Sequence, residues 1–206
     1  LVEFSDFLCP ACRAAALTVE SIRDRYKDTV RFVFRQFPLP MHGENARLGA
    51  QAALAAGAQG KFWEMHDKLF SAPDQLRGEG RAAVDRWAQE IGLDMGAFGA
   101  ALDAKTYDAA ITADMALGEE AMVGGTPTFV LNGKRLNVNF QDAEMFSQAL
   151  NDELASMGVP VPAAPAAPPP EAPVPGPTAE PVAPPPPPAP APPPAPAPPP
   201  DPNTGL

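Results

Sequence analysis

The chain has 206 residues, with 15 basic and 25 acidic side chains and a formal net charge of −10. It has no basic cluster and no run near the ~18 apolar residues of a membrane span, so we expect neither a nucleic-acid partner nor a transmembrane segment. Its last 47 residues hold 24 of its 29 prolines. We therefore predict one domain over 1–158 and a disordered Pro/Ala-rich tail over 159–206, because the tail's composition cannot offset the entropy of ordering.

A strand, a helix and a second strand are predicted at the start of the chain. Leu1–Phe4 is apolar, as in a buried strand, and we expect this strand to be truncated because the chain does not begin with Met. A helix should begin at the cysteines of Cys9–Cys12, since proline is favoured at the first helical position. Thr29–Phe37 alternates apolar and charged residues, as a strand does. Together these elements predict a βαβ unit with a parallel strand pair.

The middle of the chain, from Glu44 to Met122, is predicted to be helical in several pieces. Glycine and proline residues separate the pieces. The expected helices cover 46–56, 61–70, 82–91, 95–102 and 107–122. Large apolar side chains at helical spacing are most simply core residues, namely Phe62, Trp63, Met65, Leu69, Phe70 and Trp87.

The last part of the domain is predicted to form a hairpin followed by a helix. Gly124–Pro127 ends the helical pattern, and a third strand is expected over 128–131. Asn132-Gly133 is a strong hairpin signal, with a fourth strand over 134–138. An amphipathic helix is expected over 141–157.

The chain contains two cysteines, three residues apart, and their pattern has three interpretations. A structural disulfide across so short a loop would stabilise the fold only weakly. A zinc site would need two further ligands, and the spacing of His42 and His66 fits no common pattern. We therefore expect no metal site, and we expect packed or surface histidines. The third interpretation is a redox dithiol. A helix N-terminus lowers the pKa of a thiol at the position of Cys9, and Cys12, one turn further on, lies close enough to resolve a mixed disulfide on Cys9.

Two segments resemble the DsbA-like thioredoxin-fold oxidoreductases. They are Phe4–Cys12, with the sequence FSDFLCPAC, and Gly125–Gly133, with the sequence GTPTFVLNG. The helical block between them, including the KFWEMH stretch of 61–66, is similar to that family's helical insertion. The resemblance covers about 1–157 and excludes the tail. It implies an α/β thioredoxin fold, with a large helical insertion between its βαβ and ββα halves.

The resemblance also implies roles for individual residues. By matching positions, Cys9 is the attacking cysteine, Cys12 the resolving one, and Pro127 a cis-proline that faces the pair. Thr126 and Pro127 would offer backbone hydrogen bonds to an extended substrate.

Three further residues complete the predicted site. Pro10 and Ala11, between the cysteines, are expected to contact substrate. Glu3 matches the family's buried acid, which would exchange a proton with Cys12, although a solvated strand glutamate is the simpler interpretation.

The dipeptide Pro10-Ala11 departs from the family's oxidising members, which carry a histidine between the cysteines. Without it, the helix terminus and Arg13 remain to stabilise the Cys9 thiolate. We therefore expect a less oxidising disulfide than in those members.

These observations predict a thiol–disulfide oxidoreductase that introduces disulfides into secreted or envelope proteins in the periplasm or another extracytoplasmic compartment. Its partners would be cysteine-containing proteins and an unidentified redox partner. We expect a monomer with no cofactor beyond the Cys9–Cys12 disulfide. The alternatives are a reductase or isomerase of the same fold, and a redox-inert binding module that uses the proline-rich tail as a docking segment rather than as a spacer.

Overall fold

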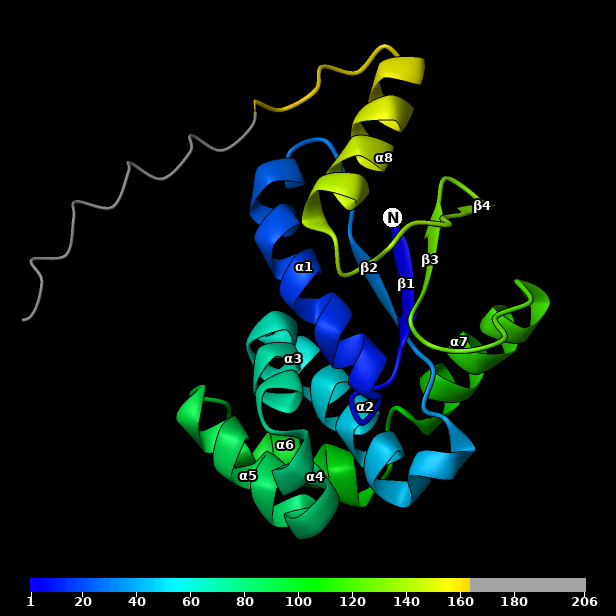
Figure 1. Cartoon of the computed structure of the whole chain (residues 1–206). Coiled ribbons are helices and arrows are strands. Elements are labelled where there is room, and N and C mark those ends of the chain that lie inside the picture. The colour runs from blue at the N-terminus through cyan, green and yellow to red at the C-terminus, as the bar shows by residue number, and fades with distance from the viewer. Residues whose placement is uncertain (164–206) are drawn as a thin grey trace, which may run out of the picture. The chain divides into compact units, whose positions relative to one another are not determined.

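The fold is described from a computed structural model that places residues 1–163. Almost all of the predicted tail, 159–206, lies outside these residues. Within them, a mixed sheet carries helices on both faces and a helical block at one end (Figure 1).

The sheet has four strands in the order β2-β1-β3-β4. Strand β1 (Val2–Ser5) pairs in parallel with β2 (Val33–Gln36) and antiparallel with β3 (Thr128–Leu131), which forms a hairpin with β4 (Lys134–Arg135). The first two strands and their connecting helix form the βαβ half, and the hairpin with its following helix forms the ββα half. The predicted thioredoxin fold is confirmed.

The two faces of β1 have different neighbours. Glu3 lies opposite Phe34 of β2 and Phe129 of β3, on the face that α1 (Pro10–Tyr26) and α8 (Ala143–Ser156) cover (Figure 1). Phe4, the next residue of β1, points to the other face, which α7 (Asp108–Glu120) covers. The acid predicted for the site is therefore placed beneath the helix that carries the cysteines.

The helical insertion packs against the start of α1. Its core contains apolar residues from its own helices together with both cysteines. The insertion comprises a 3₁₀ turn (Pro40–His42), α2 (Gly43–Gly57), α3 (Phe62–Ser71), α4 (Pro73–Glu79), α5 (Arg81–Glu90), α6 (Met95–Asp103) and α7 (Asp108–Glu120).

Helix α7 approaches the sheet closely at Gly118. A Cβ atom at this position would lie 2.5 Å from the Phe37 ring and 3.2 Å from the Phe4 ring. Only glycine allows this approach, which buries both rings on the face of the sheet opposite Glu3.

Several predicted boundaries were wrong. The prediction missed α4 entirely, and β2 is shorter than the predicted 29–37 because β1 offers only four partner residues. A fourth strand was predicted over 134–138, but β4 ends after Arg135. Beyond it the chain leaves the sheet, and Leu136 and Val138 pack against the core of the ββα half. Among the predicted core residues, Phe62 and Trp63 are only half-buried.

Candidate active site

The two cysteines lie at the N-terminus of α1. Cys9 is the N-cap residue and Pro10 the first residue of the helix. The backbone N–H of Cys9 donates to the carbonyl of Asp6 at 3.1 Å, which closes the turn between β1 and the helix. Both thiols are free. Cys9 is 8% exposed and Cys12, one turn further on, is 0% exposed, so Cys9 is the only one of the two that keeps any contact with solvent.

The surroundings of Cys9 favour its thiolate. A hydrogen bond from the Cys12 thiol is the largest cause that lowers the pKa of Cys9, which falls to about 5 although burial opposes this shift. The nearby Thr126 hydroxyl and the backbone N–H groups of Ala11 and Cys12 add to the effect. The predicted contribution of the helix terminus is therefore present, but the resolving cysteine contributes more.

Cys12 has the opposite character. Burial is the main cause that raises the pKa of its thiol, and donation to Cys9 raises it further. The hydroxyls of Ser5 and Thr126 act against this shift. The pair is therefore asymmetric, because the Cys9 thiolate is favoured and the more deeply buried Cys12 stays a protonated thiol.

Arg13 does not stabilise the Cys9 thiolate as the sequence predicted. Its guanidinium donates to the carbonyl of Ser71 at 3.3 Å. The groups that lower the pKa of Cys9 are those of Cys12, Thr126 and the backbone of the first turn.

The loop before β3 faces the cysteines. Its Thr126–Pro127 peptide bond is cis, and the Cys9 thiol lies 3.5 Å from the Thr126 carbonyl oxygen. Thr126 and Pro127 are half-buried and Pro10 is exposed, so a substrate can reach them. A hollow of about 330 Å³ beside Pro127 is lined partly by Phe129 and Phe140. The roles of these residues in substrate binding remain predictions.

Glu3 is not the solvated strand residue of the simpler interpretation. It is 4% exposed and lies between Phe34 and Phe129 across the sheet. Burial raises its pKa to about 7, against a smaller lowering effect of the Ser5 hydroxyl. A carboxyl group with this pKa can take up and release a proton near neutral pH.

Sequence reasoning missed a second buried acid next to the cysteines. The Asp6 carboxylate accepts hydrogen bonds from the backbone N–H groups of Leu8 and Leu39, each at 2.7 Å. Nδ1 of His42 lies 2.8 Å from the same carboxylate. Asp6 thereby ties the turn before Cys9 to the loop that leads into α2. Asp6 and His42 are 36 positions apart, so no local sequence pattern indicates this pair.

His66 is a packed histidine, as the sequence predicted. It is 3% exposed, and its Nδ1 lies 2.8 Å from the Asp67 carboxylate. The rings of Phe7, Phe34 and Phe70 surround it.

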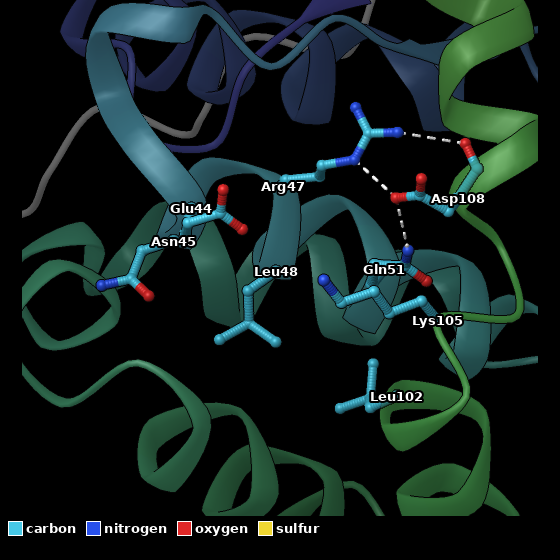
Figure 2. Close-up of a pocket in the computed structure, with 8 residues that line it drawn as sticks. All are labelled: Glu44, Asn45, Arg47, Leu48, Gln51, Leu102, Lys105 and Asp108. Carbon is cyan, nitrogen blue, oxygen red and sulfur yellow. Dashed lines mark hydrogen bonds and ion pairs between the residues drawn. The ribbon is translucent and has the colours of Figure 1, made fainter.

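A separate cavity of about 170 Å³ lies within the helical insertion (Figure 2). The Arg47 guanidinium and the Gln51 amide both donate to the Asp108 carboxylate, at 2.5 Å and 3.2 Å. None of the predicted site residues lines this cavity. Its paired polar groups tie α2 to the start of α7.

Two free cysteines at the first turn of the helix after β1, with a low pKa on the first and a raised pKa on the second, are typical of thioredoxin-fold thiol–disulfide oxidoreductases. Residues 1–152 match the family described as Thioredoxin, and the chain belongs to that family. A thioredoxin-like oxidoreductase from Silicibacter pomeroyi is 32% identical, with a TM-score of 0.61 over 75% of this chain and 85% of that one. The predicted DsbA-like resemblance and oxidoreductase class are confirmed.

More distant solved structures share the fold. BdbD from Bacillus subtilis, in its oxidised form, is 24% identical, with a TM-score of 0.62 over 75% of this chain and 86% of that one. DsbA from Xylella fastidiosa is 22% identical, with a TM-score of 0.61 over 75% and 85%.

Curated relatives are much longer than the matched part of this chain. The protein named Na(+)/H(+) antiporter NhaA 3 of Salinispora tropica is 36% identical over 156 residues, which is 76% of this chain and 23% of that protein. The chain thus spans about a quarter of that relative's length. Within residues 1–163, no helix is long and apolar enough to cross a membrane.

Proposed function

We propose that the protein oxidises cysteine pairs in other proteins, with Cys9 as the nucleophilic cysteine and Cys12 as the resolving one. A substrate thiolate attacks Sγ of Cys9 in the Cys9–Cys12 disulfide, and Cys12 leaves as a thiolate that takes up a proton. A second substrate thiolate then attacks the substrate sulfur of the mixed disulfide, and Cys9 leaves as a thiolate. The substrate gains a disulfide and the enzyme keeps two electrons as a dithiol.

The asymmetry of the cysteine pair carries this proposal. The low pKa of Cys9, about 5, makes Cys9 a good leaving group and stabilises the reduced enzyme. A disulfide whose reduced form is stabilised is the stronger oxidant. The Cys12 thiol and the Thr126 hydroxyl lower the pKa of Cys9 in this chain, which has no histidine between the cysteines.

We propose that substrates bind as an extended segment beside the cysteines. The exposed Pro10 and the half-buried Ala11 follow Cys9 in the chain, and the half-buried Thr126 and Pro127 form the loop that its sulfur approaches. Backbone groups of the Thr126–Pro127 loop can pair with such a segment, as in strand addition. This mode selects an unfolded cysteine-containing chain by its backbone, so it suits many substrate proteins.

We propose an extracytoplasmic location, because a dithiol oxidase acts where disulfides persist. The similarity to a part of proteins named Na(+)/H(+) antiporters is consistent with work at a membrane surface. The redox partner that reoxidises Cys9 and Cys12 would act in the same compartment.

The test is oxidation of a reduced, unfolded protein with two cysteines by the disulfide form of the enzyme. We expect substrate disulfides to form in proportion to enzyme consumed, and Cys9→Ser to abolish the reaction. Cys12→Ser cannot form the Cys9–Cys12 disulfide, so it should not oxidise the reduced substrate. When the same substrate is supplied in its disulfide form, the Cys9 thiolate of this variant should attack it, release one substrate thiolate and accumulate as a mixed disulfide, because the thiol that would resolve that bond is missing. If the reduced form instead cleaves substrate disulfides and the disulfide form does not oxidise, the enzyme is a reductase. If Cys9→Ser retains a bound partner and the wild type performs no exchange, the protein is a binding module.

A further inference from the structure

Three buried polar atoms on β1 and on the loop that faces the cysteines have no partner in hydrogen-bonding geometry. They are Oε1 of Glu3, Oγ of Ser5 and Oγ1 of Thr126. Buried polar groups are normally paired, since leaving one unpaired costs about 1–3 kcal/mol. Such atoms next to a reacting thiol therefore call for a functional explanation.

Glu3 and Ser5 lie in a row that leads to Cys12. They are two residues apart on β1, so their side chains leave the same face of the sheet. That face lies beneath α1, which carries Cys12 in its first turn. The Ser5 hydroxyl is close enough to both neighbours to lower the pKa of the Glu3 carboxyl and of the Cys12 thiol. Ser5 therefore stands between the two groups that must exchange a proton.

Direct exchange of the Cys12 proton with solvent is blocked. Cys12 is 0% exposed, Ser5 1% and Glu3 4%. A serine hydroxyl can accept one hydrogen bond while it donates another. It can therefore pass a proton along the row without acquiring a net charge.

Building on the function proposed above, we propose that the Ser5 hydroxyl relays the proton between the Cys12 thiol and the Glu3 carboxyl. When the Cys9–Cys12 bond breaks, the Cys12 thiolate takes the Ser5 hydroxyl proton, and Ser5 takes the proton of the Glu3 carboxylic acid. Cys12 becomes a thiol, Glu3 a carboxylate, and Ser5 is unchanged. In the reverse direction Glu3 receives the proton, and the Cys12 thiolate attacks Sγ of Cys9.

Among the groups packed around Glu3, Ser5 and Cys12, only Glu3 is suited to accept the Cys12 proton. The α1 helix contributes Cys9, whose pKa is too low to hold the proton at neutral pH. The loop before β3 contributes the Thr126 hydroxyl, and β2 contributes the uncharged Gln36 opposite Ser5. The Asp6 carboxylate instead accepts a hydrogen bond from the backbone N–H of Leu39 and lies 2.8 Å from Nδ1 of His42.

Glu3 also borders a small cavity on the side away from the cysteines. It lines a small cavity of about 10 Å³ together with Val19 and the half-buried Trp63. This is about the space that one water molecule needs. A water molecule in this space would accept the Glu3 proton on the side of Leu1, which also lines the cavity.

The relay is tested by rapid acid-quench measurement of the second step, in which Cys12 expels glutathione from its mixed disulfide with Cys9. We expect the wild-type rate to rise with a midpoint near pH 7, as Glu3 ionises. Ser5→Ala should slow this step at least about tenfold at pH 7 and move the rise to higher pH. Formation of the mixed disulfide, which depends on Cys9, should be unchanged.

Three further variants separate the relay from a packing effect. Ser5→Thr keeps the hydroxyl and should restore most of the rate. Ser147→Ala removes another buried hydroxyl, on α8, and should leave the rate unchanged. Adding Glu3→Gln to Ser5→Ala should slow the step little further, because both remove the same path.

The outcomes distinguish the relay from the function on which it rests. If the wild type never forms the Cys9–Cys12 disulfide with glutathione, the proposed function fails. If the wild type closes the disulfide and Ser5→Ala has the wild-type rate and pH profile, only the relay is overturned. An equal slowing in Ser5→Ala and Ser5→Thr would also overturn it, because the hydroxyl would then not be the cause.

Discussion

The thiol of Cys9 faces the backbone carbonyl of Thr126, with 3.5 Å between the sulfur and the oxygen. The two residues are 117 positions apart, and they come from the two halves of the fold. This approach places the nucleophile beside the loop that can hold a substrate backbone. The sulfur therefore meets its substrate where the βαβ and ββα halves join.

The reactivity of Cys9 should reveal a thiolate at mildly acidic pH. We expect its alkylation by iodoacetamide to rise with a midpoint near pH 5, and Cys12 to remain unreactive up to pH values well above that of a free thiol. Mass spectrometry of the alkylated peptides separates the two sites. A Cys9 midpoint near that of a free cysteine, about 8.5, would contradict the described electrostatics.

The source of that low pKa can be tested by substitution. Cys12→Ala removes the largest stabilising contact, so the alkylation midpoint of Cys9 should rise by at least one pH unit or so. Arg13→Met should leave the midpoint nearly unchanged, because the Arg13 guanidinium is directed at Ser71. The reverse order of effects would assign the stabilisation to Arg13.

Glu3 should make the stability of the protein depend on pH. Its pKa rises from 4.5 to about 7 on folding, so the folded state binds the proton more tightly and stability falls as pH increases between these values. Glu3→Gln should therefore match the wild type near pH 4.5 and exceed it by roughly 3 kcal/mol at pH 8. Urea denaturation at both pH values measures the difference. A stability difference that does not change with pH would show that Glu3 is ionised at the same pH in the folded and unfolded chains.

The Asp6 carboxylate should contribute more to stability than its histidine partner. Asp6→Ala leaves the buried backbone N–H of Leu8 and the partly buried N–H of Leu39 without their acceptor, which should cost about 2–4 kcal/mol. His42→Ala removes a single contact at a partly exposed ring and should cost about 1 kcal/mol. Urea denaturation gives both values, and amide hydrogen exchange should report faster opening at Leu8 and Leu39. Equal losses in the two variants would contradict this assignment.

Two helical glycines should respond to alanine in opposite directions. Gly118→Ala places a methyl group against the Phe37 and Phe4 rings and should destabilise the fold by about 1–3 kcal/mol. Gly78, in α4, has no atom within 4 Å of the added methyl, so Gly78→Ala should stabilise by about 0.5–1 kcal/mol through helix propensity. Thermal unfolding of both variants tests this contrast, and stabilisation by Gly118→Ala would refute the close packing of α7.

The elements that sequence analysis predicted well carry strong local signals. Proline after Cys9 predicted where α1 begins, and Asn132-Gly133 predicted the hairpin between β3 and β4. Helix α4 was missed because Pro73 and Gly78 were interpreted as breaks. In the structure Pro73 is the first residue of that helix, where its missing N–H costs nothing.

Features that depend on contacts between distant segments could not be predicted in the same way. The length of β2 is set by the four residues of β1 that pair with it. The local sequence of β2 does not indicate how long its partner strand is. The pairing of Asp6 with His42 requires the loop before α2 to fold back on the turn before Cys9. The burial of Glu3 was implied only by family resemblance, because its desolvation comes from Phe34 and Phe129 on other strands.

The reduction potential of the Cys9–Cys12 pair tests the central claim most directly. Equilibration against glutathione buffers, followed by counting of alkylated thiols, measures it. We predict a two-electron transition at a potential clearly more oxidising than the about −270 mV of thioredoxin, because the Cys9 thiolate stabilises the reduced form. A potential at or below that of thioredoxin would contradict an oxidase, and a pair that never cycles would contradict the redox account altogether.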